Sequence, residues 1–233
     1  MALRVKDDII QLETVIGTNS TQTVADGTAV IPGSMLPADR IVKVTAVPSI
    51  REHWVEEDRV NVDGVMTVTI IYAGQTDTGQ TYYGSTQIAD AIPFSHFVDL
   101  PGAMPEMWSQ CSAAVLDLQS SVRSDGRTVD LDIVLELTAA AVSTQEIVVV
   151  TDAAADPAVR LTAAKDVLHI EDVIGRGTAR AQIREIIPIP GGGGPDLRLL
   201  EVQGKFRPVE NRVDIDRAVI VGTMSYRAIC AGY

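Results

Sequence analysis

The sequence QLETVIG, Gln11 to Gly17, has a near copy, HIEDVIG, at His169 to Gly175. The separation of 158 residues then holds without a gap to the end of the sequence, and turn residues recur along with apolar residues. The matched positions include Ile31-Pro32-Gly33 with Ile189-Pro190-Gly191, Arg40 with Arg198, Gly64 with Gly222, Met66 with Met224, and Ala73-Gly74 with Ala231-Gly232. An offset held this long predicts one structural unit used twice.

The two copies differ in length. After Gly74 the first copy continues through further strand-like sequence to Thr138, whereas the second stops one residue past Gly232. Between them, Thr151 to Pro157 (TDAAADP) is small, acidic and closed by proline, as linkers often are. We therefore predict a complete β domain over 1–150, a linker over 151–157 and a partial second module over 158–233.

Alternation of apolar and polar residues predicts strands along nearly the whole chain. Ser124-Asp125-Gly126-Arg127 is a strong hairpin-turn sequence. The segment 59–72 is either one long strand or a hairpin bent at Gly64. The expected strands are 22–31, 41–47, 59–72, 92–98, 113–122 and 128–141, and only 156–165 and 196–200 favour short helical turns. The predicted fold class is all-β, with two β-sandwich-like modules of which the second is incomplete.

Composition and charge limit the classes of partner. The chain has 46% hydrophobic and 21% charged residues, which indicates a folded protein rather than a disordered one. Its net charge of −12 argues against nucleic acid and against an anionic membrane surface, since clustered Lys and Arg hold both. The N-terminus lacks the apolar run of a signal peptide, so we expect synthesis in the cytoplasm.

Residues with catalytic or ligand-binding chemistry occur without the spacing that such chemistry needs. The histidines and cysteines are not spaced as metal ligands or as parts of a nucleophilic catalytic site; they are His53, His96, His169, Cys111 and Cys230. The run Gly191 to Gly194 is followed by Pro195 and then Asp196, an acid where a phosphate loop needs a Lys. Acids at 56–58, at Asp130 and Asp132, and at Asp214 and Asp216 could ligate Ca²⁺, but alternating acids more often mark a solvated face. We predict no catalytic residue, no cofactor and no metal site.

Several stretches resemble one family. The chain is similar to the SPOCS domain in a series of stretches, which are, in order, VIG, LPADRIVKV, RVNVDGVMTVTIIY, IPFSHFVDLPG and VDLDIVLELTA. The most specific of them is Ile92 to Gly102. The resemblance covers 8 to about 148 as one copy and 166–233 as a half copy. It implies a spore-associated assembly module of endospore-forming bacteria, although the LysM module of better-known members is missing.

These observations leave two candidate functions. The first is a structural protein that associates with itself, and with other spore-surface proteins, into a filament, appendage or coat layer. The alternative is a carbohydrate- or ligand-binding β module that uses Trp54, Tyr82, Tyr83 and Trp108 as a stacking platform.

For the structural function, the incomplete module should leave an open sheet edge that a neighbouring chain completes. The mobile segment 1–10 is the expected donor. The residues expected at this contact are Leu3, Val5, Ile9, Ile10, Val219, Val221, Met224 and Ile229. A closed monomer, in which 75–150 pairs with both copies, is the competing arrangement.

Overall fold

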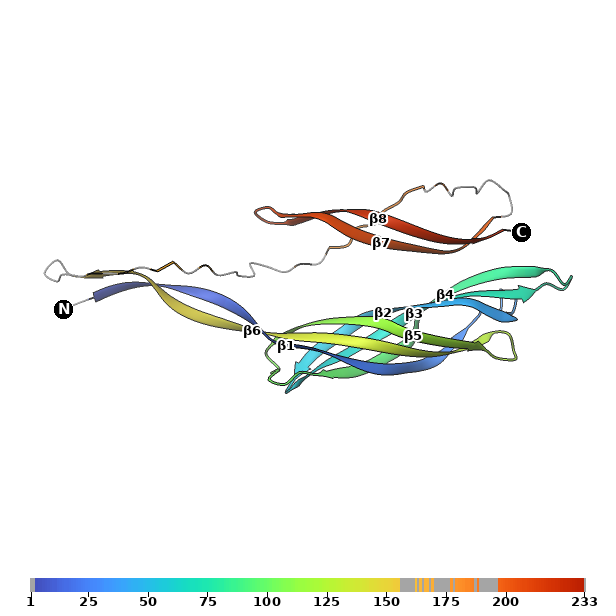
Figure 1. Cartoon of the computed structure of the whole chain (residues 1–233), viewed down its shortest axis with the longest axis horizontal. Helices are drawn as coiled ribbons and strands as arrows, with labels where there is room; N and C mark the ends of the chain where they lie inside the picture. The colour runs from blue at the N-terminus through green and yellow to red at the C-terminus, as the bar shows by residue number, and fades with distance from the viewer. Residues whose placement is uncertain are drawn as a thin grey trace.

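The structure is a computed structural model. It describes residues 3–155 and 197–232 and, between them, residues 162, 164, 166–167, 169, 177, 179–186 and 188. Over these residues the elements are eight β-strands (Figure 1). Their bounds are β1 Leu3–Val30, β2 Arg40–Glu56, β3 Arg59–Gln75, β4 Thr81–Asp99, β5 Trp108–Val122, β6 Thr128–Ala155, β7 Arg198–Val213 and β8 Ala218–Ala231. The predicted all-β class is confirmed.

Two antiparallel sheets form a sandwich. One has the strand order β1-β6-β5 and the other β2-β3-β4. Alternate residues of β3 and β6 point into the space between the sheets and are fully buried, because both strands lie in the middle of their sheets. The core of the sandwich is made chiefly of Val60, Val62, Met66, Val68, Ile70 and Tyr72 from β3 and Leu131, Ile133, Leu135 and Leu137 from β6.

The turns of the sandwich agree with the local sequence. Asp125 accepts hydrogen bonds from the backbone N–H groups of Arg127 and Thr128 and from the Thr128 hydroxyl, and Gly126 has a φ of 66°. These three hydrogen bonds lower the pKa of Asp125 to about 2. The predicted hairpin between β5 and β6 is confirmed. Gly64 lies inside the single strand β3.

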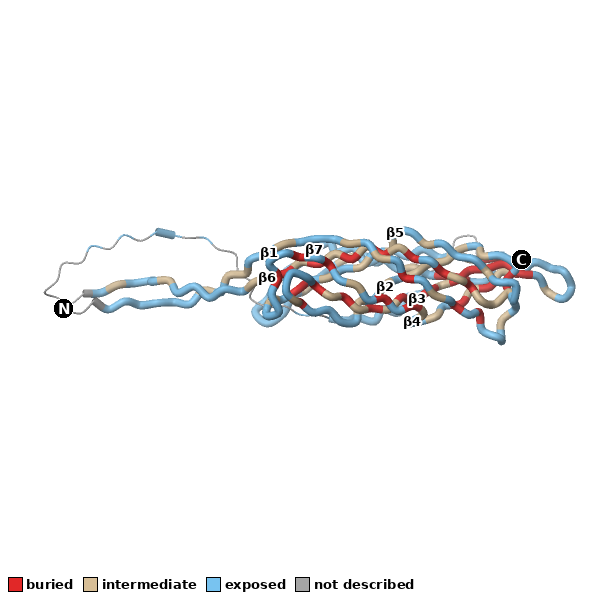
Figure 2. The backbone as a smooth tube through the Cα atoms, turned by 90° about the horizontal axis from the view of Figure 1, so that it is seen from below, coloured by how far each residue is buried: buried red, intermediate tan, exposed pale blue. Residues whose placement is uncertain are grey.

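Strands β1 and β6 extend well past the sandwich. They pair along their whole length, from Leu3 with Ala155 to Val30 with Thr128. β5 begins at Trp108 opposite Val142, so beyond that point β6 is paired with β1 alone among the described strands. Residues 3–15 and 142–155 thus form a two-stranded ribbon that projects from one end of the sandwich (Figures 1 and 2).

The remaining strands, β7 and β8, form a hairpin with the pairing of β2 and β3. Arg40 pairs with Ala73, and Arg198 pairs with Ala231. The ladder of β2 and β3 is irregular after Ile41 and after Ile50, and that of β7 and β8 is irregular at the corresponding points, after Leu199 and after Pro208. The two hairpins therefore share one register at the separation of 158 residues.

Some local expectations differ from the structure. Residues 198–200, expected in a helical turn, belong to β7, because they continue the ladder with β8. Residues 151–155, assigned to the linker, extend β6 by pairing with β1. The other expected helical turn, 156–165, and the motif at 169–175 fall largely outside the described residues. None of the described residues forms a helix with the length and apolarity needed to cross a membrane.

Candidate assembly surfaces

The β7–β8 hairpin rests on the outer face of the β2-β3-β4 sheet at one end only. Leu200 and Ala231 pack with Ile71 in a small buried cluster, and Tyr83 and Ile229 line its edge. The Ser85 hydroxyl donates a hydrogen bond of 2.5 Å to the Leu200 carbonyl. The Arg198 guanidinium donates to the Tyr83 carbonyl. The contact is small, and the rest of the hairpin extends past it.

An ion pair links the hairpin to β2 at the same place. Lys43 Nζ lies 2.6 Å from Glu201 Oε2, and the Glu201 side chain is only 7% exposed. Burial by itself would raise the pKa of Glu201, but hydrogen bonds from Lys43, Gln203 and Thr45 outweigh it and leave the pKa below its ordinary value. Glu201 is therefore held as a carboxylate, and its charge is satisfied by Lys43.

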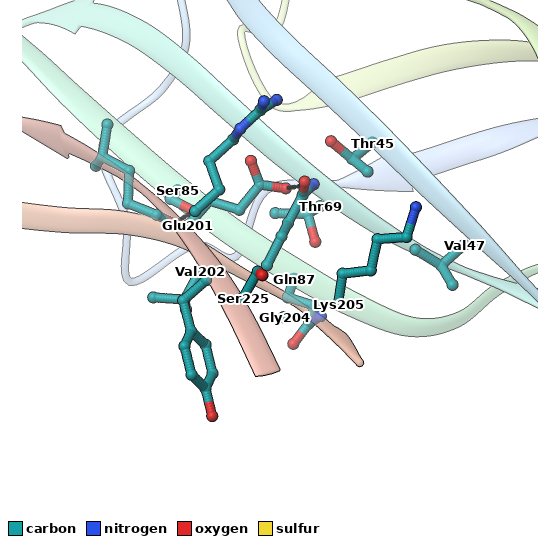
Figure 3. Close-up of a pocket in the computed structure, with 14 residues that line it drawn as sticks. Thr45, Val47, Thr69, Ser85, Gln87, Glu201, Val202, Gly204, Lys205 and Ser225 are labelled. Atoms are coloured by element: carbon teal, nitrogen blue, oxygen red, sulfur yellow. Dashed lines mark hydrogen bonds between the residues drawn. The ribbon is translucent and has the colours of Figure 1, made fainter. Parts of the chain in front are cut away.

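Beyond the ion pair the hairpin and the sheet separate into an open cleft of about 930 Å³ (Figure 3). Thr45, Val47, Thr69, Ser85 and Gln87 line it on the sheet side. The hairpin side carries Glu201, Gln203, Lys205, Ser225 and Arg227. Hydroxyls, amides and two cations face the cleft together with apolar side chains such as Val47 and Leu200, so its walls are of mixed polarity.

The opposite face of the hairpin is apolar and exposed. β8 alternates, so Ile220, Met224 and Tyr226 share one side, and β7 adds residues that pair with that side. This bare face consists of Leu199, Val202, Phe206, Val213, Ile220, Met224 and Tyr226, each more than a third exposed. Seven large apolar side chains on one small hairpin make a patch of the kind that marks an interaction surface.

The ribbon is also apolar on both of its sides. Ile9 pairs with Val148, and both are 63% exposed, while Val5 and Val150 flank them. Ile10 pairs with Ile147 on the other side, where Val149 is half-buried. An isolated two-stranded ribbon is marginally stable in water, so these residues favour a covered ribbon.

The structure separates the predicted contact residues into two places. Val5, Ile9 and Ile10 lie in the ribbon, and the backbone of Leu3 pairs with Ala155 there. On the hairpin, Met224 is on the bare face, whereas Val219, Val221 and Ile229 are on the side turned to the sheet, where Ile229 helps to cover the buried cluster. Sequence reasoning missed Phe206, Ile220 and Tyr226, although the alternation of Ile220 and Tyr226 with Met224 along β8 was a usable signal.

Of the proposed stacking aromatics, Tyr82 has no free ring face to offer a ligand. It is buried, its hydroxyl donates a hydrogen bond to the Pro37 carbonyl, and its ring meets Tyr72 edge-on with centroids 6.1 Å apart. Burial raises the pKa of Tyr82 to about 12. Trp54 and Trp108 are partly exposed, and the Trp54 indole N–H donates to Glu56.

The other residues considered as catalytic or metal-ligating candidates pack against or pair with neighbouring side chains. His53 Nδ1 lies 2.9 Å from the Ser109 hydroxyl, and His96 stacks on Phe97. Burial raises the pKa of the Cys111 thiol, which disfavours the reactive thiolate. Asp130 and Asp214 are paired with Arg123 and Arg217. Within the described part of the chain, no three His, Cys, Asp or Glu side chains gather closely enough to hold a metal ion.

Comparison with known protein families gives a match for part of the chain. Residues 37–123 match the family described as SipL, SPOCS domain. The matched region runs from the loop before β2 through β5, and so takes in the whole β2-β3-β4 sheet and the edge strand β5. It confirms the resemblance for one copy over these residues. No curated protein matches the chain, and no solved structure does.

Proposed function

We propose that this chain is a non-catalytic structural protein that assembles with copies of itself through β-strand edges into a filament, appendage or coat layer of a spore or cell surface. The SPOCS match supports the spore association. Further spore-surface proteins are candidate partners in such a layer. Nucleic acid and membrane remain poor candidates, because the chain carries a net charge of −12.

Unpaired strand edges support the proposal. The β7–β8 hairpin is a two-stranded sheet whose outer edges have no strand partner among the described residues. The ribbon likewise has two outer edges that no described strand pairs. Free edges beside exposed apolar side chains are the template on which strands of another chain add.

The N-terminal segment remains our candidate for the donated strand. Residues 3–10 pair with the end of β6 in the ribbon. The sandwich does not depend on them, since its own part of β1 runs from Gly17 to Val30 and contacts the core there. Donation would therefore exchange ribbon pairing for pairing with a neighbour while the sandwich stays folded.

Electron microscopy of the purified chain in negative stain at neutral pH tests the proposal. We expect ordered polymers for the full chain and their loss when residues 1–10 are deleted, with the near-UV circular dichroism of the sandwich retained. Dispersed monomers of the full chain would overturn self-assembly. Unchanged polymers after the deletion would overturn the assigned donor and leave the structural function standing.

A further inference from the structure

The bare face of the β7–β8 hairpin is built like the core face of the first hairpin. The shared register places Ile220, Met224 and Tyr226 at the positions that Val62, Met66 and Val68 occupy in β3. Those three residues of β3 are completely buried, because the opposite sheet covers them. The second hairpin thus presents side chains suited to a sandwich core, with no described strand over them.

In the sandwich, the covering layer is the three-stranded sheet β1-β6-β5, with β6 in its middle. The inward residues of β6 supply most of this layer's buried side chains, and Gly27 of β1 lies so close to Ile92 of β4 that an added Cβ would be 3.1 Å from that side chain. The same two strands continue past the sandwich as the ribbon, where their apolar side chains have no sheet beneath them. The ribbon is therefore a covering layer of the kind that the second hairpin lacks.

A ribbon cannot reach the hairpin of its own chain while it remains part of β1 and β6. It points away from the end of the sandwich, and the hairpin lies alongside the sandwich (Figures 1 and 2). We propose that the bare face of β7–β8 is covered by the ribbon of a second copy of this chain. This proposal rests on the self-association proposed above, and it replaces strand donation by residues 1–10 with an intact ribbon.

The ribbon and the hairpin differ in overall charge, but the bare face is uncharged. The ribbon carries two basic residues, Arg4 and Lys6, and five acidic ones, Asp7, Asp8, Glu13, Glu146 and Asp152. The hairpin from Arg198 to Ala231 carries six basic residues and four acidic ones, against eight and 21 in residues 3–155. The basic side chains of β7 and β8 lie on the side turned to the sheet, and Arg217 is in the turn, so the bare face itself offers the ribbon an uncharged, apolar surface.

The contact joins two different surfaces, so each copy keeps a free ribbon at one end and a free hairpin face at the other. Such a heterologous contact does not close on a pair of chains, and it propagates as a ring or an open filament. The ribbon binds face to face here, so its two strands stay paired with each other. This differs from donation of residues 1–10, in which those residues leave β6.

Disulfide trapping between two singly labelled chains tests the contact. Both chains carry Cys111→Ser and Cys230→Ser, one carries Ile9→Cys and a size tag, and the other carries Ile220→Cys. Ile9 and Ile220 are 63% and 61% exposed, so neither change disturbs a core. We expect a disulfide-linked dimer of one tagged and one untagged chain to be the main oxidised product. A matched control replaces Ile9→Cys by Val24→Cys, which is equally exposed but lies in the sandwich part of β1.

Equal yields from the Ile9 and Val24 chains would overturn the ribbon contact. A chain that carries both Ile9→Cys and Ile220→Cys and closes on itself as a monomer would also overturn it. Ile220→Asp supplies a second readout, since it should abolish polymers while Val24→Asp leaves them. Polymers that survive Ile220→Asp would refute this contact without refuting self-assembly, whereas a full chain that never polymerises would refute both.

Discussion

Lys43 and Glu201, joined by an ion pair of 2.6 Å, occupy the same position in two hairpins that share one register. Ile71 and Ile229, which meet at the nearby buried cluster, are related in the same way. The hairpins therefore face each other through equivalent residues, as the two halves of a twofold contact do. Opposite charges at this one position turn a repulsive contact between like residues into an attractive one.

Reversing this ion pair tests whether it holds the hairpin in place. Lys43→Glu places two carboxylates together beside a buried cluster, and we expect it to weaken docking of the hairpin by about 1–2 kcal/mol, given that Lys43 is partly exposed. Hydrogen exchange of β7 and β8 would measure the loss. The double variant Lys43→Glu with Glu201→Lys should restore protection, and failure of that rescue would show that packing alone holds the hairpin.

The same carboxylate predicts an acid-sensitive contact. The pKa of Glu201 in the folded protein lies below its ordinary value of 4.5, so its charge stabilises docking above that value. Docking should weaken as the pH falls from 4.5 through the lower pKa of the docked state. Limited proteolysis of β7 and β8 between pH 7 and pH 3 would measure this loss of docking. Glu201→Gln is the control, and it should remove this step while leaving the unfolding of the sandwich unchanged.

Gly64 is required by close packing within the first hairpin. A Cβ added there would lie 2.6 Å from the Ser49 carbonyl and would also overlap the Phe94 ring. We expect Gly64→Ala to destabilise the sandwich by about 1–3 kcal/mol, since neither the backbone nor a buried ring can move away freely. Chemical denaturation would measure it.

Gly222 is the matched position in the second hairpin. An added Cβ there would overlap the Arg207 carbonyl and lie 2.6 Å from the ring of Phe206, so both clashes lie within the hairpin. Gly222→Ala should therefore leave unfolding of the sandwich unchanged and alter only the hairpin. Equal losses from both substitutions would mean that the hairpin and the sandwich unfold as one unit.

The sequence predicted local structure and failed at long-range pairing. Alternation and the Asp125-Gly126 turn identified most strands, and the separation of 158 that aligned Gly64 with Gly222 coincides with the shared register of the hairpins. Nothing local indicated that Leu3 pairs with Ala155, because an exposed ribbon with apolar residues on both sides lacks the polar alternation of a half-buried strand. The residues of the bare face were identified only in part, because neighbouring residues of a strand point to opposite sides and a shift of one residue exchanges the two sides.

The last prediction concerns which parts of the chain fold alone. Residues 8–148 hold every strand of both sandwich sheets and the whole main core, so we expect this fragment to unfold in one sharp transition. Residues 157–233 contribute only the hairpin to the described structure, and most of its apolar side chains are exposed. A two-stranded sheet with one small buried cluster lacks the buried surface needed for independent stability, so this fragment should show no cooperative melt by circular dichroism.

Adding the 8–148 fragment in excess should protect β7 and β8 from hydrogen exchange, because Ile71, Lys43 and Ser85 supply the docking site. A sharp melt of soluble, monomeric 157–233 would contradict this prediction and would mean that the second module is complete in itself.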